Sequence, residues 1–171
     1  MSELHAVARY MDQRGLLLVT AESCTAGLIA AHLADVPGAG GLLDCAFVVY
    51  SPEAKKQCLN VSERTLQTHN LTSEAVAREM AQGALAASGR ANVAIANTGL
   101  ADDSDKDLPA GTQCFAWAFR SKYPESPMIL FSETRRFQGD RTQIREASAF
   151  YALQGIPRYF EKAAGSVADC G

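Results

Sequence analysis

The sequence predicts an α/β fold in which helices cover both faces of a β-sheet. Short apolar runs with the composition of strands alternate with segments of helical periodicity, which is the usual order in such folds. The last two predicted strands, 111–120 and 128–137, follow each other without an intervening helix, so we expect them to pair antiparallel. A length of 171 residues suits one domain, which would bury roughly two-thirds of its unfolded surface.

The first third of the chain predicts a helix, a strand and a second helix. Apolar residues recur at helical spacing at Leu4, Val7, Ala8 and Met11. Gly15 ends this helix, and the apolar run 16–19 follows as a strand. A small, hydroxyl-rich turn over 20–27 then leads into a helix over 28–34.

The middle of the chain predicts one strand and two short helices. The glycine-rich segment 36–41 interrupts regular structure, and residues 42–50 have the aliphatic and aromatic content of a strand. The segment 51–53 combines a serine cap, a proline at the first position and an acid in the first turn. It therefore predicts a helix over 52–59, and a second short helix is expected over 63–68.

The second half predicts a longer helix, three strands and a final helix. Ser73 is the expected cap of the longer helix and Gly89 its stop. A buried strand over 91–97 follows, and the antiparallel pair comes after it. Asp140 is the expected cap of the last helix, which we predict to run to about Phe160.

Residues 155–157, Gly-Ile-Pro, predict a bend in that last helix. The final ten residues, which are rich in alanine and glycine, predict a frayed tail. We therefore expect one domain over 1–171 with its core at about 5–160.

Composition and charge exclude several classes of protein. The apolar runs are far shorter than a membrane span, and the N-terminus lacks the apolar segment of a secretion signal, so we expect no membrane partner and a cytoplasmic location. The net charge of −3 leaves no basic stripe, which argues against a nucleic-acid partner. The cysteines predict neither disulfides nor a metal site, because no C-x-x-C pair occurs, and we expect reduced, mostly buried thiols. They are Cys24, Cys45, Cys58, Cys114 and Cys170.

The turn around Ser23 is the first of four polar clusters that fall at predicted strand ends or helix starts. It places hydroxyl groups and backbone N–H groups at a helix N-terminus, where negative charge is stabilised. Such a turn can bind an anion or hold a nucleophile. The structural alternative is that Ser23 or Thr25 only caps the helix.

Lys55 belongs to the second cluster, which follows Tyr50. A lysine one turn inside a helix N-terminus meets the positive end of the helix dipole, which lowers its pKa if it is also buried. It can then act as general base for a serine. The alternative is a solvated surface lysine, as we expect for Lys56. None of the three histidines lies in a recognisable catalytic motif.

The third and fourth clusters are the strand end 97–99 and the helix start 139–145. In the former, a hydroxyl and a permissive glycine either line a pocket or form a simple turn. In the latter, Arg141 and Arg145 lie four residues apart on one helix face and can clamp a phosphate or carboxylate. Salt bridges of these arginines to Asp140 and Glu146 are the alternative.

In combination, the clusters resemble the CinA C-terminal domain family, whose enzymatic members are nicotinamide-nucleotide amidases. The motifs that carry the resemblance are Ala21-Glu-Ser-Cys-Thr-x-Gly27, Phe47-Val-x-Tyr-Ser-x-Glu-Ala-Lys55, Ser73-Glu-x-Val-Ala-Arg-Glu-Met80 with Gly83-Ala84, Thr98-Gly99, and Phe137-x-Gly-Asp-Arg-x-x-Ile-Arg145. The resemblance implies a three-layer α/β/α sandwich with a mixed sheet. It also implies hydrolysis of nicotinamide mononucleotide to nicotinic acid mononucleotide and ammonia, without a metal or other cofactor.

The resemblance also implies roles for single residues. Ser23 would be the nucleophile, Lys55 its base, and Tyr50 a group that relays a proton or orients the lysine. The substrate would be bound by Thr25, Thr98, Gly99, Arg141 and Arg145, with backbone N–H groups near Thr25 supporting the oxyanion. The protein would act alone or as a homo-oligomer, most simply a dimer.

Two departures from the family pattern leave other functions open. Ala26 replaces a usual glycine, and the glycine-rich run after Thr-Gly is replaced by 100–109, in which four aspartates and one lysine sum to −3. These carboxylates would repel a phosphate unless the loop points into solvent. The alternatives are a divergent member that binds another small molecule or a protein partner without amidase activity, and a hydrolase of neutral or cationic amides.

Overall fold

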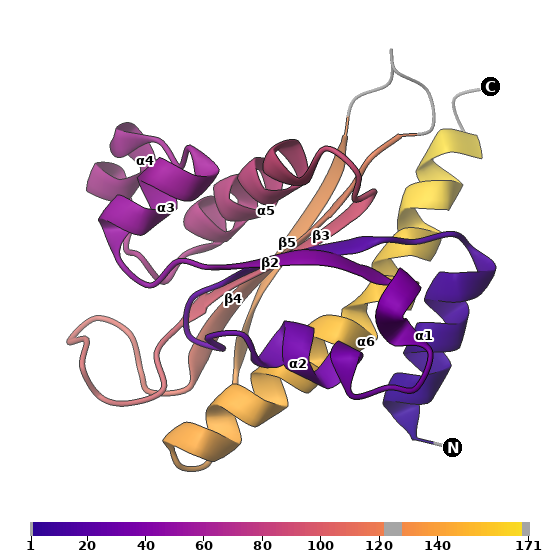
Figure 1. Ribbon diagram of the computed structural model, residues 1–171. Coiled ribbons are helices and arrows are strands. Elements are labelled where there is room, and N and C mark those ends of the chain that lie inside the picture. Colours follow the sequence, from indigo (N-terminus) through magenta and orange to yellow (C-terminus); the bar gives the residue numbers. More distant parts are fainter. Residues whose placement is uncertain (1, 122–127, 169–171) are drawn as a thin grey trace.

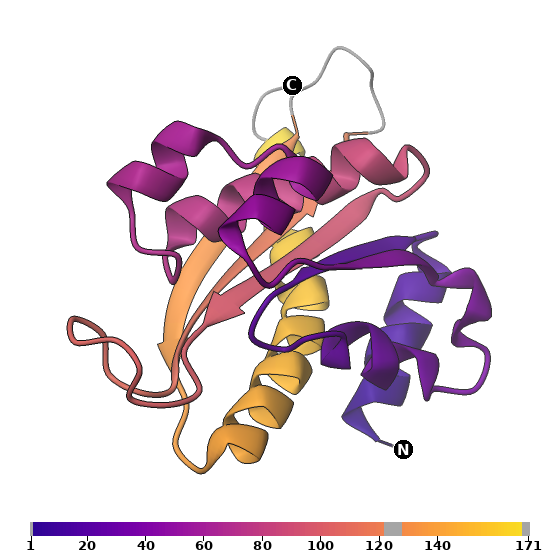
Figure 2. The same cartoon turned by 60° about the vertical axis from the view of Figure 1, so that its left-hand side comes forward.

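The structure, a computed structural model, describes residues 2–121 and 128–168 and contains a five-stranded mixed sheet between two layers of helices (Figures 1 and 2). The strand order is β2-β1-β3-β4-β5. Strand β1 pairs in parallel with β2 and β3, whereas β4 pairs antiparallel with β3 and β5. The strands are β1 (Leu18–Glu22), β2 (Leu43–Val48), β3 (Val93–Gly99), β4 (Thr112–Phe119) and β5 (Ile129–Arg136). The predicted fold class and the antiparallel pair are confirmed.

Helices α1, α2 and α6 cover one face of the sheet, and α3, α4 and α5 lie over the other (Figures 1 and 2). Their bounds are α1 (Glu3–Gln13), α2 (Leu28–Ala34), α3 (Pro52–Leu59), α4 (Glu63–Thr68), α5 (Glu74–Ser88) and α6 (Arg141–Ala168), with a 3-10 turn over Ala39–Gly41. Within residues 2–121 and 128–168, none of these helices is long and apolar enough to cross a membrane.

The predicted helix caps are confirmed. The side chain of Ser51 accepts a hydrogen bond from the N–H of Ala54, and Ser73 caps α5 in the same way. Asp140 accepts from the N–H of Gln143 and so caps α6. Each cap satisfies a backbone donor that the first helical turn would otherwise leave unpaired.

Two apolar cores lie on the two faces of the sheet. Alternate residues of β4 supply both, because successive side chains of a strand point to opposite faces. Phe115 and Trp117 pack with α1, α2 and α6, whereas Cys114, Ala116 and Ala118 face α5. The small side chains on the second face let α5 lie close to the sheet.

Helices α3 and α5 approach each other closely at Gly83. A Cβ atom at this glycine would lie 1.9 Å from the carbonyl oxygen of Leu59, the last residue of α3. Any larger residue would therefore push the two helices apart. Because α3 carries Lys55, this contact also fixes the position of the lysine relative to the sheet.

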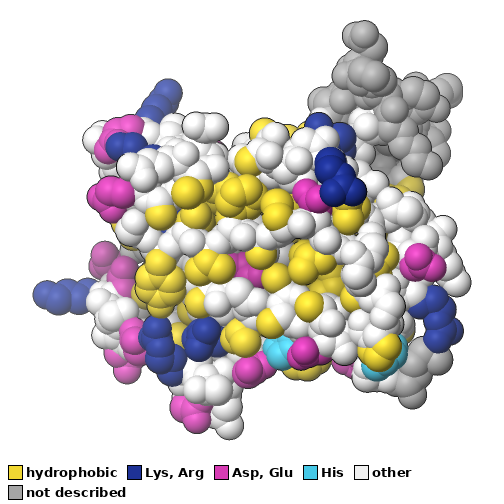
Figure 3. Space-filling model, viewed as in Figure 1, with side chains coloured by type: hydrophobic (Ala, Val, Ile, Leu, Met, Phe, Trp, Pro, Cys, Tyr) yellow, Lys and Arg dark blue, Asp and Glu magenta, His cyan; other side chains and the backbone are white. Residues whose placement is uncertain are grey.

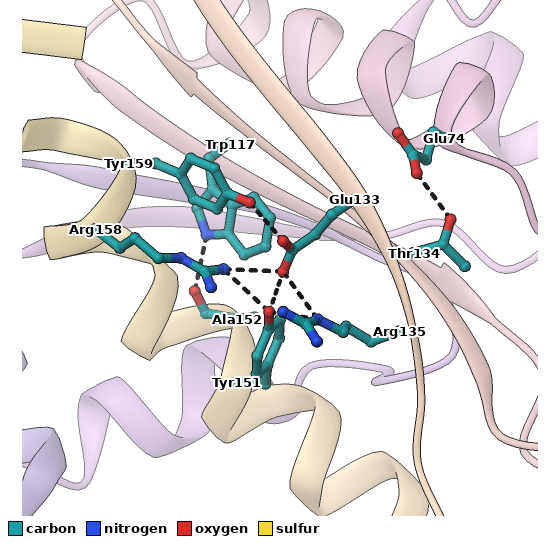
Figure 4. Close-up of polar contacts among 9 residues, drawn as sticks. All are labelled: Glu74, Trp117, Glu133, Thr134, Arg135, Tyr151, Ala152, Arg158 and Tyr159. Atoms are coloured by element: carbon teal, nitrogen blue, oxygen red, sulfur yellow. Dashed lines mark hydrogen bonds and ion pairs between the residues drawn. The ribbon is translucent and has the colours of Figure 1, made fainter. Parts of the chain in front are cut away.

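Helix α6 is held to the edge of the sheet by a polar cluster (Figure 4). Glu133 of β5 accepts hydrogen bonds from Tyr151, Arg158 and Tyr159 of α6. The indole N–H of Trp117 donates to the carbonyl of Ala152 at 2.9 Å, which adds a bond from β4. On the opposite face of β5, Thr134 donates to Glu74 at 2.9 Å. These contacts fix α6 along its length and so place its N-terminus.

Strand β1 starts and ends later than the apolar run 16–19 predicts. It covers Leu18–Glu22, and all five of its residues are buried. The polar residues Thr20 and Glu22 can lie in this buried strand because their side chains are hydrogen-bonded to each other. A prediction from apolar periodicity does not take such a bond into account. Strand β3 likewise extends beyond 97 to Gly99.

The predicted frayed tail is wrong for residues 161–168, because α6 continues to Ala168. The helix passes through Pro157 without interruption. Burial explains this: Ile156 and Ala163 are at most 5% exposed, so packing outweighs the local preference for a break. Residues 169–171 lie outside the described residues.

Four cysteines are described, and all four are free thiols. Cys24 and Cys114 are buried, Cys45 is half-buried and Cys58 is exposed. The expectation of mostly buried thiols therefore holds for only two of them. Cys170 lies outside the described residues.

Candidate active site

A cavity of about 560 Å³ lies at the carboxyl ends of β1 and β3. Open α/β sheets place ligands at this end of their parallel strands. Its walls come from the turn after β1, the segment between β2 and α3, the loop after β3 and the start of α6. The cavity therefore joins residues from all four polar clusters of the sequence.

Ser23 and Lys55 meet in the wall of this cavity. The Nζ atom of Lys55 lies 3.0 Å from Oγ of Ser23, and it also donates to the carbonyl oxygens of Val49 at 2.9 Å and Tyr50 at 3.0 Å. The lysine is only 1% exposed. The alternative of a solvated surface lysine is therefore wrong for Lys55, whereas Lys56 is exposed and pairs with Glu63.

Burial lowers the pKa of Lys55 from its usual value to about 8, because the charged form loses its hydration. The two backbone carbonyls can only accept hydrogen bonds, so they take two of the amine protons. When Lys55 is neutral, its lone pair faces the one partner that can donate, the hydroxyl of Ser23. This arrangement suits proton transfer from the serine to the lysine.

Helix α2 is capped by Glu22 rather than by Ser23 or Thr25. The carboxylate of Glu22 is fully buried and accepts from the backbone N–H groups of Gly27, Ile29 and Ala30. It also accepts from the hydroxyls of Thr20 and Thr25. The alternative of a capping serine is wrong, and the hydroxyl of Ser23 contacts Lys55 instead.

Among the backbone N–H groups of the turn 23–27, that of Cys24 is available to a ligand. In the turn 23–27, the N–H of Ser23 donates to the carbonyl of Asn97, and that of Thr25 donates to the Asn97 side chain at 3.1 Å. The N–H groups of Ala26 and Gly27 are bonded within the turn and to Glu22. In the described part of the chain, the Cys24 N–H has no acceptor, and Cys24 lines the cavity.

Thr25 does not line the cavity formed by the described residues. It is fully buried, and both its hydroxyl and its N–H are bonded to protein groups. The structure therefore does not bring Thr25 to the cavity, where the resemblance implies a contact with substrate. Thr25 fixes the turn that carries Ser23, because it bonds both Glu22 and Asn97.

Two buried amides support the turn around Ser23. Asn97 belongs to the third polar cluster of the sequence, whereas Gln113 was not among the expected site residues. The Nδ2 of Asn97 donates to the Gln113 side chain at 3.0 Å. Gln113 in turn donates to Sγ of Cys24 and to the carbonyl of Leu100. Both amides are 0% exposed, and they connect β3 and β4 to the turn around Ser23. The polar Asn97 at the end of a buried strand was the available signal.

Thr98 and Gly99 do line the cavity, as expected. The hydroxyl of Thr98 donates to the carbonyl of Leu71 at 2.9 Å, which fixes the segment before α5. A Cβ atom on Gly99 would lie 2.1 Å from the side chain of Gln113. Glycine is therefore required here to leave the Gln113 amide in place.

Tyr50 contacts Lys55 through its backbone and Arg141 through its side chain. Its ring is 57% exposed, and its hydroxyl accepts from Nη2 of Arg141 at 3.0 Å. The expected proton relay through the phenol is not supported by this geometry. Orientation of the lysine comes from the Tyr50 carbonyl oxygen.

The predicted clamp of Arg141 and Arg145 is not formed. Arg141 lines the cavity, but Arg145 donates to the backbone carbonyls of Cys24 at 2.9 Å and Thr25 at 3.2 Å. Arg145 therefore holds the turn around Ser23. The alternative salt bridges are also wrong: Glu146 pairs with His32, and Asp140 caps α6.

Most residues of the 101–108 loop are exposed, yet two of its carboxylates contact residues that line the cavity. Asp102 forms an ion pair with Arg141 at 2.7 Å, and Asp105 accepts a hydrogen bond from Asn70 at 2.8 Å.

Among the described residues, no group of three or more His, Cys, Asp and Glu side chains converges to hold a metal ion.

The chain is similar to proteins of one family. The family model of the CinA C-terminal domain matches residues 2–160. A protein from Escherichia coli named nicotinamide-nucleotide amidohydrolase PncC is 39% identical over 158 residues, which cover 90% of each chain. A putative competence-damage inducible protein from Symbiobacterium thermophilum is 44% identical, with 90% of this chain matched. The present chain spans only 37% of that relative's length.

Solved structures of related proteins have the same fold as this chain. The competence damage-inducible protein A from Klebsiella pneumoniae superposes with a TM-score of 0.83 at 34% identity, covering 94% of this chain and 98% of that one. A competence/damage inducible protein from Agrobacterium tumefaciens gives a TM-score of 0.78 at 33% identity, with coverage of 92% and 96%. The chain belongs to the CinA C-terminal domain family.

Proposed function

We propose that the chain is an amidohydrolase that converts nicotinamide mononucleotide to nicotinic acid mononucleotide and ammonia. The observation that carries the proposal is the contact between buried Lys55 and Ser23 at the cavity wall. The relatives named nicotinamide-nucleotide amidohydrolase support the choice of substrate. Other relatives carry only the names CinA-like or competence-damage inducible protein.

The residues suit a two-step hydrolysis through an acyl-enzyme. In the first step, Oγ of Ser23 attacks the carboxamide carbon while Nζ of Lys55 takes the hydroxyl proton. The Cys24 N–H stabilises the oxyanion, and the C–N bond breaks as Lys55 returns the proton to the leaving ammonia. In the second step, water gives a proton to Lys55 and attacks the ester carbon. The bond between that carbon and Oγ breaks as Lys55 returns the proton to Ser23, and the carboxylic acid is released.

Ammonia release from nicotinamide mononucleotide tests this proposal, with Ser23→Ala as the matched control. We expect release by the wild-type protein and its loss in the variant, because alanine removes the hydroxyl nucleophile, together with its hydrogen bond to Lys55. Circular dichroism would check that both proteins are folded. Absence of release by folded wild-type protein would refute the amidase.

The second candidate function is a binding protein of the same family without amidase activity. The ion pair between Asp102 and Arg141 favours this candidate, because it occupies the arginine expected to face the nucleotide. The ammonia assay separates the two functions. Only the amidase predicts release that depends on Ser23.

The rate of hydrolysis should rise with pH through the pKa of Lys55. Lysine acts as a base only when neutral, and burial lowers its pKa to about 8. We expect kcat/KM to increase about tenfold per pH unit below pH 7 and to level off above about pH 9. A profile that stays flat between pH 6 and 9 would remove Lys55 from the rate-limiting proton transfer.

A further inference from the structure

The 101–108 loop contacts two parts of the cavity wall. Asp102 contacts Arg141 at the start of α6, and Asp105 contacts Asn70 before α5. Asp105 also accepts from the N–H groups of Asp107 and Leu108, which keeps the loop turned at that point. In Figure 3, acidic and basic side chains lie side by side at the lower left, over this loop and the start of α6.

The charged groups of the cavity are already paired with protein groups. Among the described residues, those that line it and carry charge are Lys55, Arg141, Asp102 and Asp105. Lys55 is bonded to two carbonyls and Ser23, so Arg141 is the cation that an anionic substituent would approach. One of its Nη groups faces Asp102 and the other faces Tyr50.

We propose that Asp102 is a specificity-determining residue that competes with the phosphate of the substrate for Arg141. Its carboxylate occupies the position beside Nη1 that a phosphate oxygen would take. Asp102 should therefore reduce the preference of the protein for the phosphorylated amide over the same amide without phosphate. A neutral residue at this position should increase that preference. This inference rests on the proposed function for the class of substrate.

The pair between Asp102 and Arg141 is weak enough to be displaced. The two side chains are 52% and 51% exposed, and exposed ion pairs are screened by water and salt. A phosphate dianion carries more charge than one carboxylate and can accept two hydrogen bonds from a guanidinium. Hydrogen bonds from Ser104 and the charge of Arg141 lower the pKa of Asp102, so its carboxylate stays charged at neutral pH and competes.

The competition should change binding and not chemistry. Among the described residues, Asp102 contacts Arg141 and Ser104, and neither Ser23 nor Lys55 is its partner. The Asp102→Asn variant keeps the size of the side chain and removes its charge. We expect it to lower the KM for nicotinamide mononucleotide about three- to tenfold at unchanged kcat.

Titration calorimetry on the Ser23→Ala background tests the inference without requiring turnover. The probes are nicotinamide mononucleotide and nicotinamide riboside, which differ only in the phosphate. Asp102→Asn should lower the Kd for the mononucleotide three- to tenfold and leave that for the riboside within about twofold. Asp103→Asn is the matched control, because Asp103 is an exposed carboxylate of the same loop and does not line the cavity formed by the described residues.

Three results would overturn the inference: an unchanged Kd for the mononucleotide, an equal shift for the riboside, or an equal shift in Asp103→Asn. No binding of the mononucleotide to either variant would also overturn it. Failure of the proposed function is a separate result, because it is decided by ammonia release from wild-type protein. If wild-type protein releases ammonia but Asp102→Asn leaves the ratio of the Kd values for mononucleotide and riboside unchanged, only the role of Asp102 is refuted.

Discussion

Lys55→Met is expected to lower amide hydrolysis about 10²- to 10⁴-fold or more while the protein remains folded. Methionine has nearly the length of lysine but no basic nitrogen, so Ser23 loses the group that takes its proton. The side chain is 1% exposed, and an apolar replacement suits that environment. Ammonia release and circular dichroism measure the two expected results.

The same variant tests the pKa of Lys55 through stability. Unfolded lysine titrates near 10.5 and folded Lys55 near 8, so between these values the unfolded chain binds more protons. The free energy of unfolding of wild-type protein should therefore rise, relative to Lys55→Met, as the pH increases from about 8 to 10.5. The difference between the unfolded and folded pKa values of Lys55 corresponds to about 3 kcal/mol in the free energy of unfolding. Urea unfolding of both proteins at pH 7 and pH 10 measures the difference.

Lys56→Met is the matched control for both measurements. Lys56 is the next residue, and it is exposed and paired with Glu63. We expect near-normal activity from it and no comparable pH-dependent difference in stability. Lys55→Arg adds a variant that keeps the charge but cannot deprotonate at neutral pH, and it should be inactive. Substantial activity in folded Lys55→Met would show that the lysine is not the base.

Most of the fold was predictable because local signals and the observed packing agree. The caps Ser51, Ser73 and Asp140 mark helix starts that the structure confirms. The final helix was the exception. Its last eight residues have weak local signals, and packing of Ala163 extends it beyond the predicted end.

The contact between Ser23 and Lys55 was predictable, and the residues that support it were not. Ser23 and Lys55 follow from their positions at a strand end and a helix start, together with the family resemblance. The roles of Glu22, Asn97 and Arg145 were not predictable, because each is set by contacts between segments that no spacing reveals. The same reason explains why the spacing suggested a clamp of Arg141 and Arg145, whereas Arg145 bonds the turn around Ser23.

Glu22→Gln is expected to lower the free energy of unfolding by about 2–4 kcal/mol, although glutamine has the same size and shape. The carboxylate accepts bonds from three backbone N–H groups, which can only donate. Glutamine has one accepting oxygen and one donating nitrogen. In one orientation its NH₂ group faces the N–H groups of Gly27 and Ile29, and in the other it faces that of Ala30.

Thr20→Val is the matched control for this variant. It removes a single hydroxyl donor to Glu22 from the same buried strand and keeps the shape of the side chain. We expect it to cost about 1 kcal/mol, as for one hydrogen bond. Urea unfolding of the two variants and wild-type protein gives the comparison. Equal losses of unfolding free energy in the two variants would mean that the carboxylate of Glu22 is not needed to pair the backbone N–H groups of α2.

Activity should fall in Glu22→Gln even under conditions in which the variant stays folded. Glu22 bonds Thr25 and Gly27, so it fixes the turn that places Ser23 3.0 Å from Lys55. Displacement of a nucleophile by about 1 Å can cost a factor of about a hundred in rate. We therefore expect kcat to drop about ten- to a hundredfold with a smaller change in KM. A folded variant with wild-type kcat would show that Glu22 stabilises α2 without positioning the nucleophile.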